Sequence, residues 1–269
     1  MLHRLFYAVV LTAATIVSVQ AQTVRFDTNV GTFDMELNPT GNPGLQGHVD
    51  NLLAYVESGR FKQVVVNRAP ANFVIQMAGF TTDTLTLPEN FSDFPAVPSF
   101  GDVIVDEDLD GTPDFDITGL TNTRGTVSLA LSGPLNSGSS SFFINLGDNT
   151  GSLDPQGFIP FANINDMATI DLILSLEQTS LPDGDIASSD IPILSNNRLV
   201  VVEDVFVLEP PVMFAAASAS TSTESDFTSA ETAFGPASSA SFASVPEPPA
   251  LVVAVGMFML IVVFYRRSI

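Results

Sequence analysis

The chain contains no cysteine, and this absence is the first restriction on its chemistry. Disulfide bonds, thiolate nucleophiles and cysteine-ligated zinc sites are therefore excluded. Histidine is nearly absent as well, because only His3 and His48 occur in 269 residues. Two histidines do not build a multi-histidine metal site. A Ser-His-Asp triad would have to rest on His48, which stands beside Gly47 in what reads as a polar turn, with no triad motif around it.

Basic residues are also scarce, with 9 lysines and arginines against 30 aspartates and glutamates and a net charge of −21. Three of the basic residues, Arg4, Arg266 and Arg267, lie at the ends of the chain, so the part between them is the more acidic. Such a surface repels phosphate backbones, and we expect no nucleic-acid partner. The 45% of hydrophobic residues is enough for a packed core.

The first 21 residues have the three parts of a secretory signal peptide. Arg4 provides the basic start, residues 5–19 are apolar, and Val19-Gln20-Ala21 is a small-residue cleavage site. A transmembrane anchor is the alternative, but the apolar run is short for a membrane span. We therefore expect an exported protein whose residues 1–21 are removed.

A second apolar run, residues 250–265, lies near the C-terminus and ends in Arg266 and Arg267. It follows Pro246-Glu247-Pro248, and the whole segment 245–269 resembles the PEP-CTERM sorting signal of exopolysaccharide-producing bacteria. The arginines would stay on the cytoplasmic side and stop transfer. The resemblance implies cleavage by a sortase-like enzyme, whereas a plain tail anchor is the alternative. Either reading predicts an extracytoplasmic protein that is anchored to the membrane or released after processing.

Pro210 and Pro211 mark the end of a folded domain that we place at residues 22–210. Residues 211–244 are rich in serine, alanine and threonine, carry scattered acidic residues and show no core-forming period. This composition predicts a disordered linker between the domain and the C-terminal segment.

Most of the domain shows the period-two alternation of β-strands. A glycine turn at Gly31 separates two such strands, and helical spacing follows at residues 49–59 and again at 166–176. Residues 80–123 are polar, acidic and rich in proline, and they read as a long surface excursion. Many strands with two helices predict a mostly β barrel or sandwich with helical caps. The further strands are expected at residues 64–66, 73–76, 125–131, 141–146 and 199–207.

Four segments of the domain carry a family resemblance, in a fixed order along the chain. Residues 67–79 resemble F-H-R, a short loop and F-M-x-Q-G-G; residues 124–127 resemble R-G-T-I/V. Residues 133–145 resemble G-P-N-x-x-x-S-Q-F-F-I, and residues 153–161 resemble L-D-G-x-x-x-V-F-G with one residue inserted. These are the signature segments of cyclophilins, and the match runs from about Val24 to Val207.

The cyclophilin resemblance implies a closed eight-stranded antiparallel barrel capped by two helices. It also implies peptidyl-prolyl cis-trans isomerase activity on proline-containing polypeptides, without a cofactor or a metal, in a protein that we expect to be a monomer. Exported clients would then be assisted in folding, because uncatalysed X-Pro rotation takes tens to hundreds of seconds.

By position, the resemblance assigns Arg68, Gln76 and Phe73 to catalysis. Arg68 would act on the prolyl nitrogen, Gln76 would bond the substrate backbone, and Phe73 would help to hold the proline ring. The residues that the resemblance places along the substrate groove are Val74, Phe143, Leu153, Phe158 and Leu131.

The chain departs from the family at several groove positions. Asn67 replaces the usual histidine, Val74 a methionine, Leu131 an asparagine that contacts substrate backbone, and Ser141 a glutamine. Fewer backbone-binding groups should weaken substrate orientation more than the bond rotation itself. The alternative is therefore a catalytically weakened barrel that serves as a surface or matrix binding module.

Residues 106–114 contain carboxylates at alternate positions followed by a glycine, as at the start of a calcium loop. Asp106, Asp108 and Asp110 would be the ligands, with Gly111 at the sharp turn. Against this, Ile117 stands at the twelfth position, where an EF-hand has glutamate. A solvated acidic loop remains the alternative.

Overall fold

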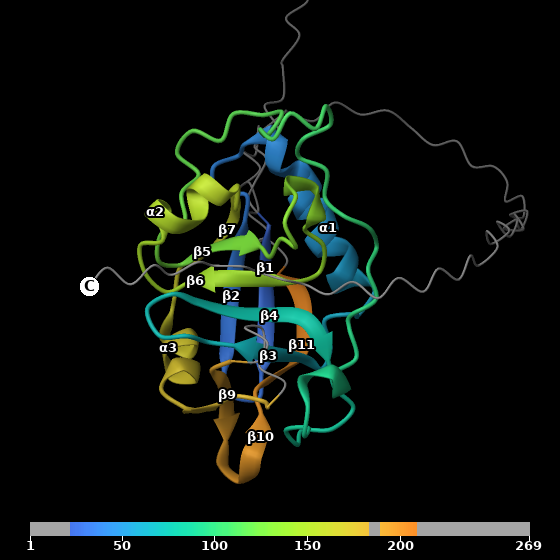
Figure 1. Ribbon diagram of the computed structural model, residues 1–269, viewed down its shortest axis with the longest axis vertical. Coiled ribbons are helices and arrows are strands. Elements are labelled where there is room, and N and C mark those ends of the chain that lie inside the picture. Colours follow the sequence, from blue (N-terminus) through green and yellow to red (C-terminus); the bar gives the residue numbers. More distant parts are fainter. Residues whose placement is uncertain (1–21, 183–188, 209–269) are drawn as a thin grey trace, which may run out of the picture. The chain divides into compact units, whose positions relative to one another are not determined.

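The computed structural model describes residues 22–182 and 189–208 (Figure 1). The predicted signal peptide at 1–21, the linker at 211–244 and the C-terminal segment at 245–269 lie outside these residues. In the two described ranges, no helix combines the length and the apolar character that a membrane span requires.

Eight antiparallel strands close into a barrel in the order β1-β11-β3-β4-β6-β5-β7-β2, which confirms the predicted architecture (Figure 1). Glycine at position 31 closes the β1–β2 hairpin, as its sequence pattern indicates. The barrel strands are β1 (Thr23–Thr28), β2 (Thr32–Leu37), β3 (Val64–Arg68), β4 (Val74–Thr81), β5 (Thr126–Leu129), β6 (Phe142–Asn145), β7 (Pro160–Ile164) and β11 (Val201–Leu208).

Large side chains fill the inside of the barrel. The rings of Phe26 and Phe33 stack with centroids 4.9 Å apart and planes 2° from parallel, and Phe142 meets Phe26 edge-on at 5.7 Å. All three rings belong to one buried cluster together with Phe161 and Met35. An eight-stranded barrel has room inside for side chains of this size and little else. A ligand must therefore bind outside the barrel wall.

Side chains alternate between the two faces of the wall, as the pleat of a strand requires. On β6, Phe142 and Ile144 belong to the interior cluster, whereas Phe143 belongs to a separate apolar cluster on the outer face. Strand β4 follows the same rule, with Ile75 inside and Val74 outside. The strand register thus decides which residues are available to a ligand.

Two helices pack against the barrel on opposite sides in Figure 1, α1 (Gln46–Glu57) and α3 (Ala168–Leu174). Leu52 and Tyr55 of α1, and Ile170 of α3, are buried in the interior cluster. Gly59 follows α1 with φ at 71°, the left-handed conformation that suits the end of a helix. Both predicted helices are thereby confirmed, and α2 (Thr150–Leu153) is a single additional turn.

The segment from residue 80 to 123 corrects the sequence interpretation. Apart from the end of β4 and a short 3₁₀ turn, Phe91–Asp93, it has little regular structure, as expected. It is nevertheless packed against the rest of the domain and is not merely a surface excursion, because Phe94, Val97 and Val103 are buried. Its isolated apolar residues anchor it at intervals, a spacing that neither a helical nor a strand period reveals.

A small three-stranded sheet was not predicted, namely β8 (Glu177–Thr179), β9 (Ile191–Leu194) and β10 (Arg198–Leu199) in the order β10-β9-β8. Ile191 and Leu199 form a second apolar cluster with Val65 and Val201 of the barrel. The strands are very short and β9 contains Pro192, so their sequence carries no clear alternation.

His48 also differs from its sequence interpretation, because it lies inside α1 and not in a polar turn. The helix begins earlier than predicted, after a 3₁₀ turn in which the Asn42 side chain accepts from the Gly44 N–H. His48 is 4% exposed, its ring stacks on Phe161 at 5.5 Å, and its Nδ1 has no hydrogen-bond partner. Burial lowers the pKa of His48 to about 4, which favours the neutral imidazole.

This burial predicts a loss of stability in acid. The pKa of a histidine in an unfolded chain is about 6.5. Between about pH 6.5 and pH 4, His48 is therefore protonated in the unfolded chain but neutral in the folded chain. The free energy of unfolding should therefore fall as pH falls through that window, by about 2 kcal/mol between pH 7 and pH 4.5 from His48 alone. Urea denaturation of the wild type and of His48→Leu at both pH values measures this difference. If the free energy of unfolding fell equally in the two proteins between about pH 7 and pH 4.5, burial of His48 would not be the cause.

Candidate functional site

A pocket on the outer face of the barrel is lined by seven of the eight residues that the sequence singled out for substrate and catalysis. Leu131 is the exception, since it packs in the same outer apolar cluster without lining the pocket. The lining residues are Arg68, Phe73, Val74, Gln76, Phe143, Leu153 and Phe158.

Three neighbouring strands place the central residues of this pocket in one row. Arg68 at the end of β3 pairs with Gln76 of β4, and Gln76 pairs with Phe143 of β6. Directly opposed residues of antiparallel strands point to the same face of a sheet. Cation, amide and aromatic ring are therefore presented side by side across the barrel wall.

A β-bulge sets this row. Val66 pairs with Met77, yet Arg68, two residues further on, pairs with Gln76. The β3 strand therefore carries one extra residue here, and a bulge of this kind re-aims the side chains that follow it. Without the shift, Arg68 would oppose Ile75, whose side chain points into the barrel.

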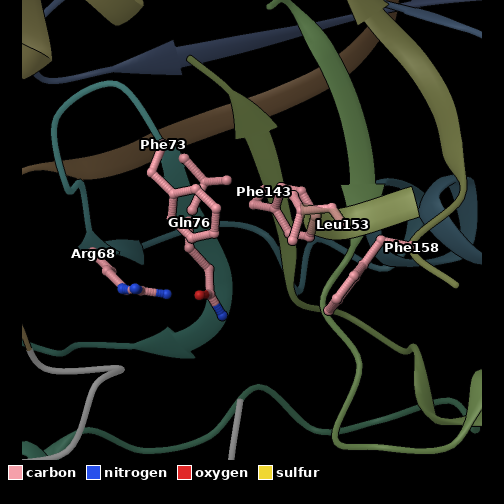
Figure 2. Close-up of a pocket in the computed structure, with 7 residues that line it drawn as sticks. Arg68, Phe73, Gln76, Phe143, Leu153 and Phe158 are labelled. Carbon is pink, nitrogen blue, oxygen red and sulfur yellow. The ribbon is translucent and has the colours of Figure 1, made fainter. Parts of the chain in front are cut away.

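The apolar side of the pocket is a packed wall. The Phe143 and Phe158 rings meet edge-on with centroids 5.4 Å apart, and Leu153 and Val74 are buried in the same cluster. Figure 2 shows Phe143, Leu153 and Phe158 gathered on one side of the pocket, opposite Arg68 and Gln76. Such a surface suits a compact apolar group, because burying it removes apolar area from water.

The polar side carries a nearly buried cation. Arg68 is 8% exposed, and its guanidinium carbon lies 5.7 Å from the centroid of the Phe73 ring. Gln76 is 1% exposed, and its Nε2 donates to Ser141 Oγ at 3.2 Å. A guanidinium keeps its charge at every physiological pH and presents fixed donors. The site could therefore bind an apolar group of a ligand beside a permanent positive charge. Its lining residues include no histidine, thiol or carboxylate.

The acidic loop is separate from this pocket and differs in detail from its sequence interpretation. Carboxylate oxygens of Asp106, Asp108 and Asp114 lie within 4.8 Å of one another, and Asp110 is not part of that group. The Asp110 carboxylate instead accepts from Thr112, and these hydrogen bonds lower the pKa of Asp110. Calcium binding by the loop stays a prediction from sequence.

Sequence reasoning missed a group of buried asparagines behind the pocket, at positions 122, 145 and 149. Asn145 alone carries a signal, as a polar residue inside a predicted strand, whereas Asn122 and Asn149 lie outside the predicted strands and carry none. It also treated Ser141 as a lost substrate contact, whereas the structure pairs its hydroxyl with Gln76.

Comparison with known proteins shows the family of the chain. The family model described as cyclophilin type peptidyl-prolyl cis-trans isomerase/CLD matches residues 23–197, more than half of the chain. A peptidyl-prolyl cis-trans isomerase of Streptomyces antibioticus is 31% identical over 132 residues, which are 47% of this chain and 63% of that protein. Peptidyl-prolyl cis-trans isomerase A of Dickeya dadantii is 29% identical over 126 residues, or 47% of this chain and 55% of that protein. The match thus spans less than two thirds of either relative.

Solved structures include a similar chain as well. A cyclophilin type peptidyl-prolyl cis-trans isomerase of Cryptosporidium parvum aligns over 71% of this chain and 99% of its own, with 22% identity and a TM-score of 0.47.

The contact between Gln76 and Ser141 generates a prediction about side-chain order. Ser141→Ala removes the acceptor of the Gln76 amide, so the Gln76 side-chain NH₂ signals should shift and show faster motion in ¹⁵N relaxation. The stability cost should be about 1 kcal/mol, as for one buried hydrogen bond. The matched control is Ser137→Ala, which removes a buried hydroxyl that bonds Ser132 and Pro134. Unchanged Gln76 signals in Ser141→Ala would show that the serine does not hold the amide.

Proposed function

Because the chain belongs to the cyclophilin-type peptidyl-prolyl cis-trans isomerase family, we propose that it catalyses rotation about X-Pro peptide bonds. The observation that carries this proposal is the row formed by Arg68, Gln76 and Phe143 on the outer face of the barrel. A proline ring would pack on the apolar wall, and its peptide nitrogen would then face the guanidinium.

The chemistry asked of the site is modest. Amide resonance makes the barrier to rotation ~18–20 kcal/mol. As the bond twists, the nitrogen pyramidalises and its lone pair becomes localised, and a positioned donor stabilises that lone pair more than it stabilises the planar amide. Arg68 is the cation that lines the pocket, and its burial strengthens the interaction.

The other lining residues would orient the substrate. Phe143, Leu153 and Phe158 would hold the proline ring, while Gln76 would bond the backbone of the substrate beside the rotating bond. Holding one side of the bond fixed lets the other side turn, and this requires no covalent step. The substrate class is accordingly a polypeptide that contains proline.

A binding module without catalysis is the second candidate, and Leu131 favours it. The family resemblance puts a backbone-binding asparagine at this position, whereas the structure packs Leu131 into the apolar cluster, 8% exposed. One anchor for the substrate backbone is thereby replaced by an apolar side chain. The two candidates differ in whether bound proline peptides exchange faster.

We also propose that the protein acts outside the cytoplasm on exported clients. Support comes from the sequence of both ends, namely the signal-peptide pattern of residues 1–21 and the sorting-signal resemblance of residues 245–269. In this location, X-Pro isomerisation of newly exported chains would be the step that the enzyme accelerates. Membrane attachment through the C-terminal segment belongs to the same proposal.

The catalytic proposal predicts a specific effect of the cation. Arg68→Ala should lower kcat for an X-Pro peptide by about 10²–10³-fold, as removal of one preorganised transition-state donor does. NMR exchange spectroscopy of the cis and trans peptide signals measures this rate. Arg68→Lys should recover only part of it, because an ammonium lacks the planar array of donors.

The matched control is Arg60→Ala, which removes a guanidinium that packs over Phe100, 3.6 Å from the ring centroid, and donates to the Pro98 carbonyl. Its exchange rate should equal that of the wild type. A wild type that binds the peptide without accelerating exchange would refute catalysis and leave the binding module.

Export predicts a mature N-terminus at Gln22. Expression of the full chain in a Gram-negative host should give a secreted or membrane-bound product whose N-terminal sequence begins after Ala21. Replacing Val19 and Ala21 with arginine should block cleavage and retain the precursor, because the cleavage site needs small residues. Accumulation of the uncleaved wild type in the cytoplasm would contradict the proposed location.

A further inference from the structure

Behind the pocket lies a buried polar network centred on Asn122, in the segment that precedes β5. Asn122 is 0% exposed, and every hydrogen-bonding position of its amide is used. Its Nδ2 donates to Asp154 Oδ1 and to the Phe158 carbonyl, both at 2.7 Å. Its Oδ1 accepts from Ser128 Oγ at 2.8 Å and from Asn145 Nδ2 at 3.0 Å.

The backbone of Asn122 joins the same network. Its N–H donates to Asp154 Oδ1 at 2.9 Å, and its carbonyl accepts from the Asn149 N–H at 2.8 Å. Side chain and backbone together fix this residue against two other segments, the α2 turn and the stretch that leads into β7. Such a saturated network in a low-dielectric interior holds one arrangement.

The network ends on the residues that line the pocket. Asn122 holds the Phe158 carbonyl directly, and Asp154 is the residue after Leu153. The Asn149 side chain donates to the Phe73 carbonyl at 2.8 Å, and the Asn149 carbonyl accepts from the Leu153 N–H at 2.8 Å. Three lining residues from three different segments are thus tied to one group of asparagines.

The strand registers extend the same connection to the rest of the wall. Ser128 of β5, which donates to Asn122, stands opposite Phe143 of β6. Asn145 of β6, the second donor to Asn122, stands opposite Val74 of β4. Opposed residues share a face of the sheet, so these network members lie on the outer face, beside the wall and not in the interior.

We propose that Asn122 is a positioning residue for the apolar wall of the pocket, an inference that rests on the proposed isomerase function for its catalytic meaning. Asparagine suits the position because its amide offers two donors and two acceptors in one plane. A side chain without them would leave the Phe158 carbonyl, Asp154 and Ser128 with buried polar groups unsatisfied. Phe158 and Leu153 would then lose their common anchor.

Loss of the wall contacts and loss of the cation should change different kinetic constants. The wall contacts the proline ring in the cis, trans and twisted states alike, so its loss should raise KM. Arg68 acts on the twisted state, so its loss should lower kcat. A change at Asn122 should therefore resemble a defect in the wall, although Asn122 is buried behind it.

The experiment compares Asn122→Ala with the milder Asn149→Ala and with a matched control, Asn29→Ala. Asn29 also bonds through both ends of its amide, to the Leu199 carbonyl and the Val201 N–H, on the far part of the barrel where β1 meets β11. We expect KM for an X-Pro peptide to rise about tenfold in Asn122→Ala, with kcat within about threefold of wild type. Asn149→Ala should give a smaller rise, and Asn29→Ala none. An Asn122→Ala enzyme with unchanged KM would overturn the inference.

A second readout does not depend on activity or on the folding of the severest variant. Methyl signals of Leu153 and Val74 report the aromatic rings around them, so NMR of the full protein shows whether the wall has moved. They should shift in Asn149→Ala, and in Asn122→Ala if it folds, but not in Asn29→Ala. Unmoved methyl signals in a folded Asn122→Ala protein would overturn the positioning role. If that variant does not fold, Ser128→Ala, which removes the Ser128 donor to Asn122 Oδ1, gives the same test. Absence of isomerase activity in the wild type, together with shifted methyl signals in the variants, would refute the proposed function and leave the positioning role intact.

Discussion

Packed aromatic and aliphatic side chains fill the inside of the closed barrel, and this constraint governs where the protein can do chemistry. Phe26 and Phe33 stack within it and Phe142 meets Phe26 edge-on, so the inward positions of the strands are committed to packing. The outward positions alone remain for a ligand. Because side chains alternate along each strand, a slip of one residue in β4 or β6 would exchange the two sets completely. Barrel packing and site assembly are therefore consequences of the same register.

The outer face shows what the register makes available. Arg68, Gln76 and Phe143 form a row across three strands, and the bulge in β3 brings the arginine into that row. On the same face, beside the wall, Asn122 and its partners join the loops that carry Phe158 and Leu153 to the strands. The sheet thus supports the cation and the strand-borne part of the wall, whereas a buried network supports Phe158 and Leu153.

Much of this could be predicted from the sequence. The period-two strands, the two helices and the segments around Arg68 and Phe143 carry local signals. The order of the motifs along the chain was enough to name seven residues that line the pocket. What could not be predicted depends on contacts distant in sequence. The sequence suggests a polar turn at His48, because its contact with Phe161 is distant in sequence. It suggests a loop residue at Asn122, because the hydrogen bond to Asp154 is equally distant. Likewise Asp114 replaces Asp110 in the acidic group, because the turn of the loop, and not alternate spacing, decides which carboxylates converge.

The most direct test of the account is a crystal structure of the protein with an X-Pro peptide bound. The account predicts that the proline ring packs against Phe143 and Leu153, with carbon atoms within about 4 Å, and that the Arg68 guanidinium faces the prolyl nitrogen. A peptide bound at another face of the barrel, with this pocket unoccupied, would contradict the central claim. So would a proline ring seated in the pocket with its nitrogen turned away from Arg68.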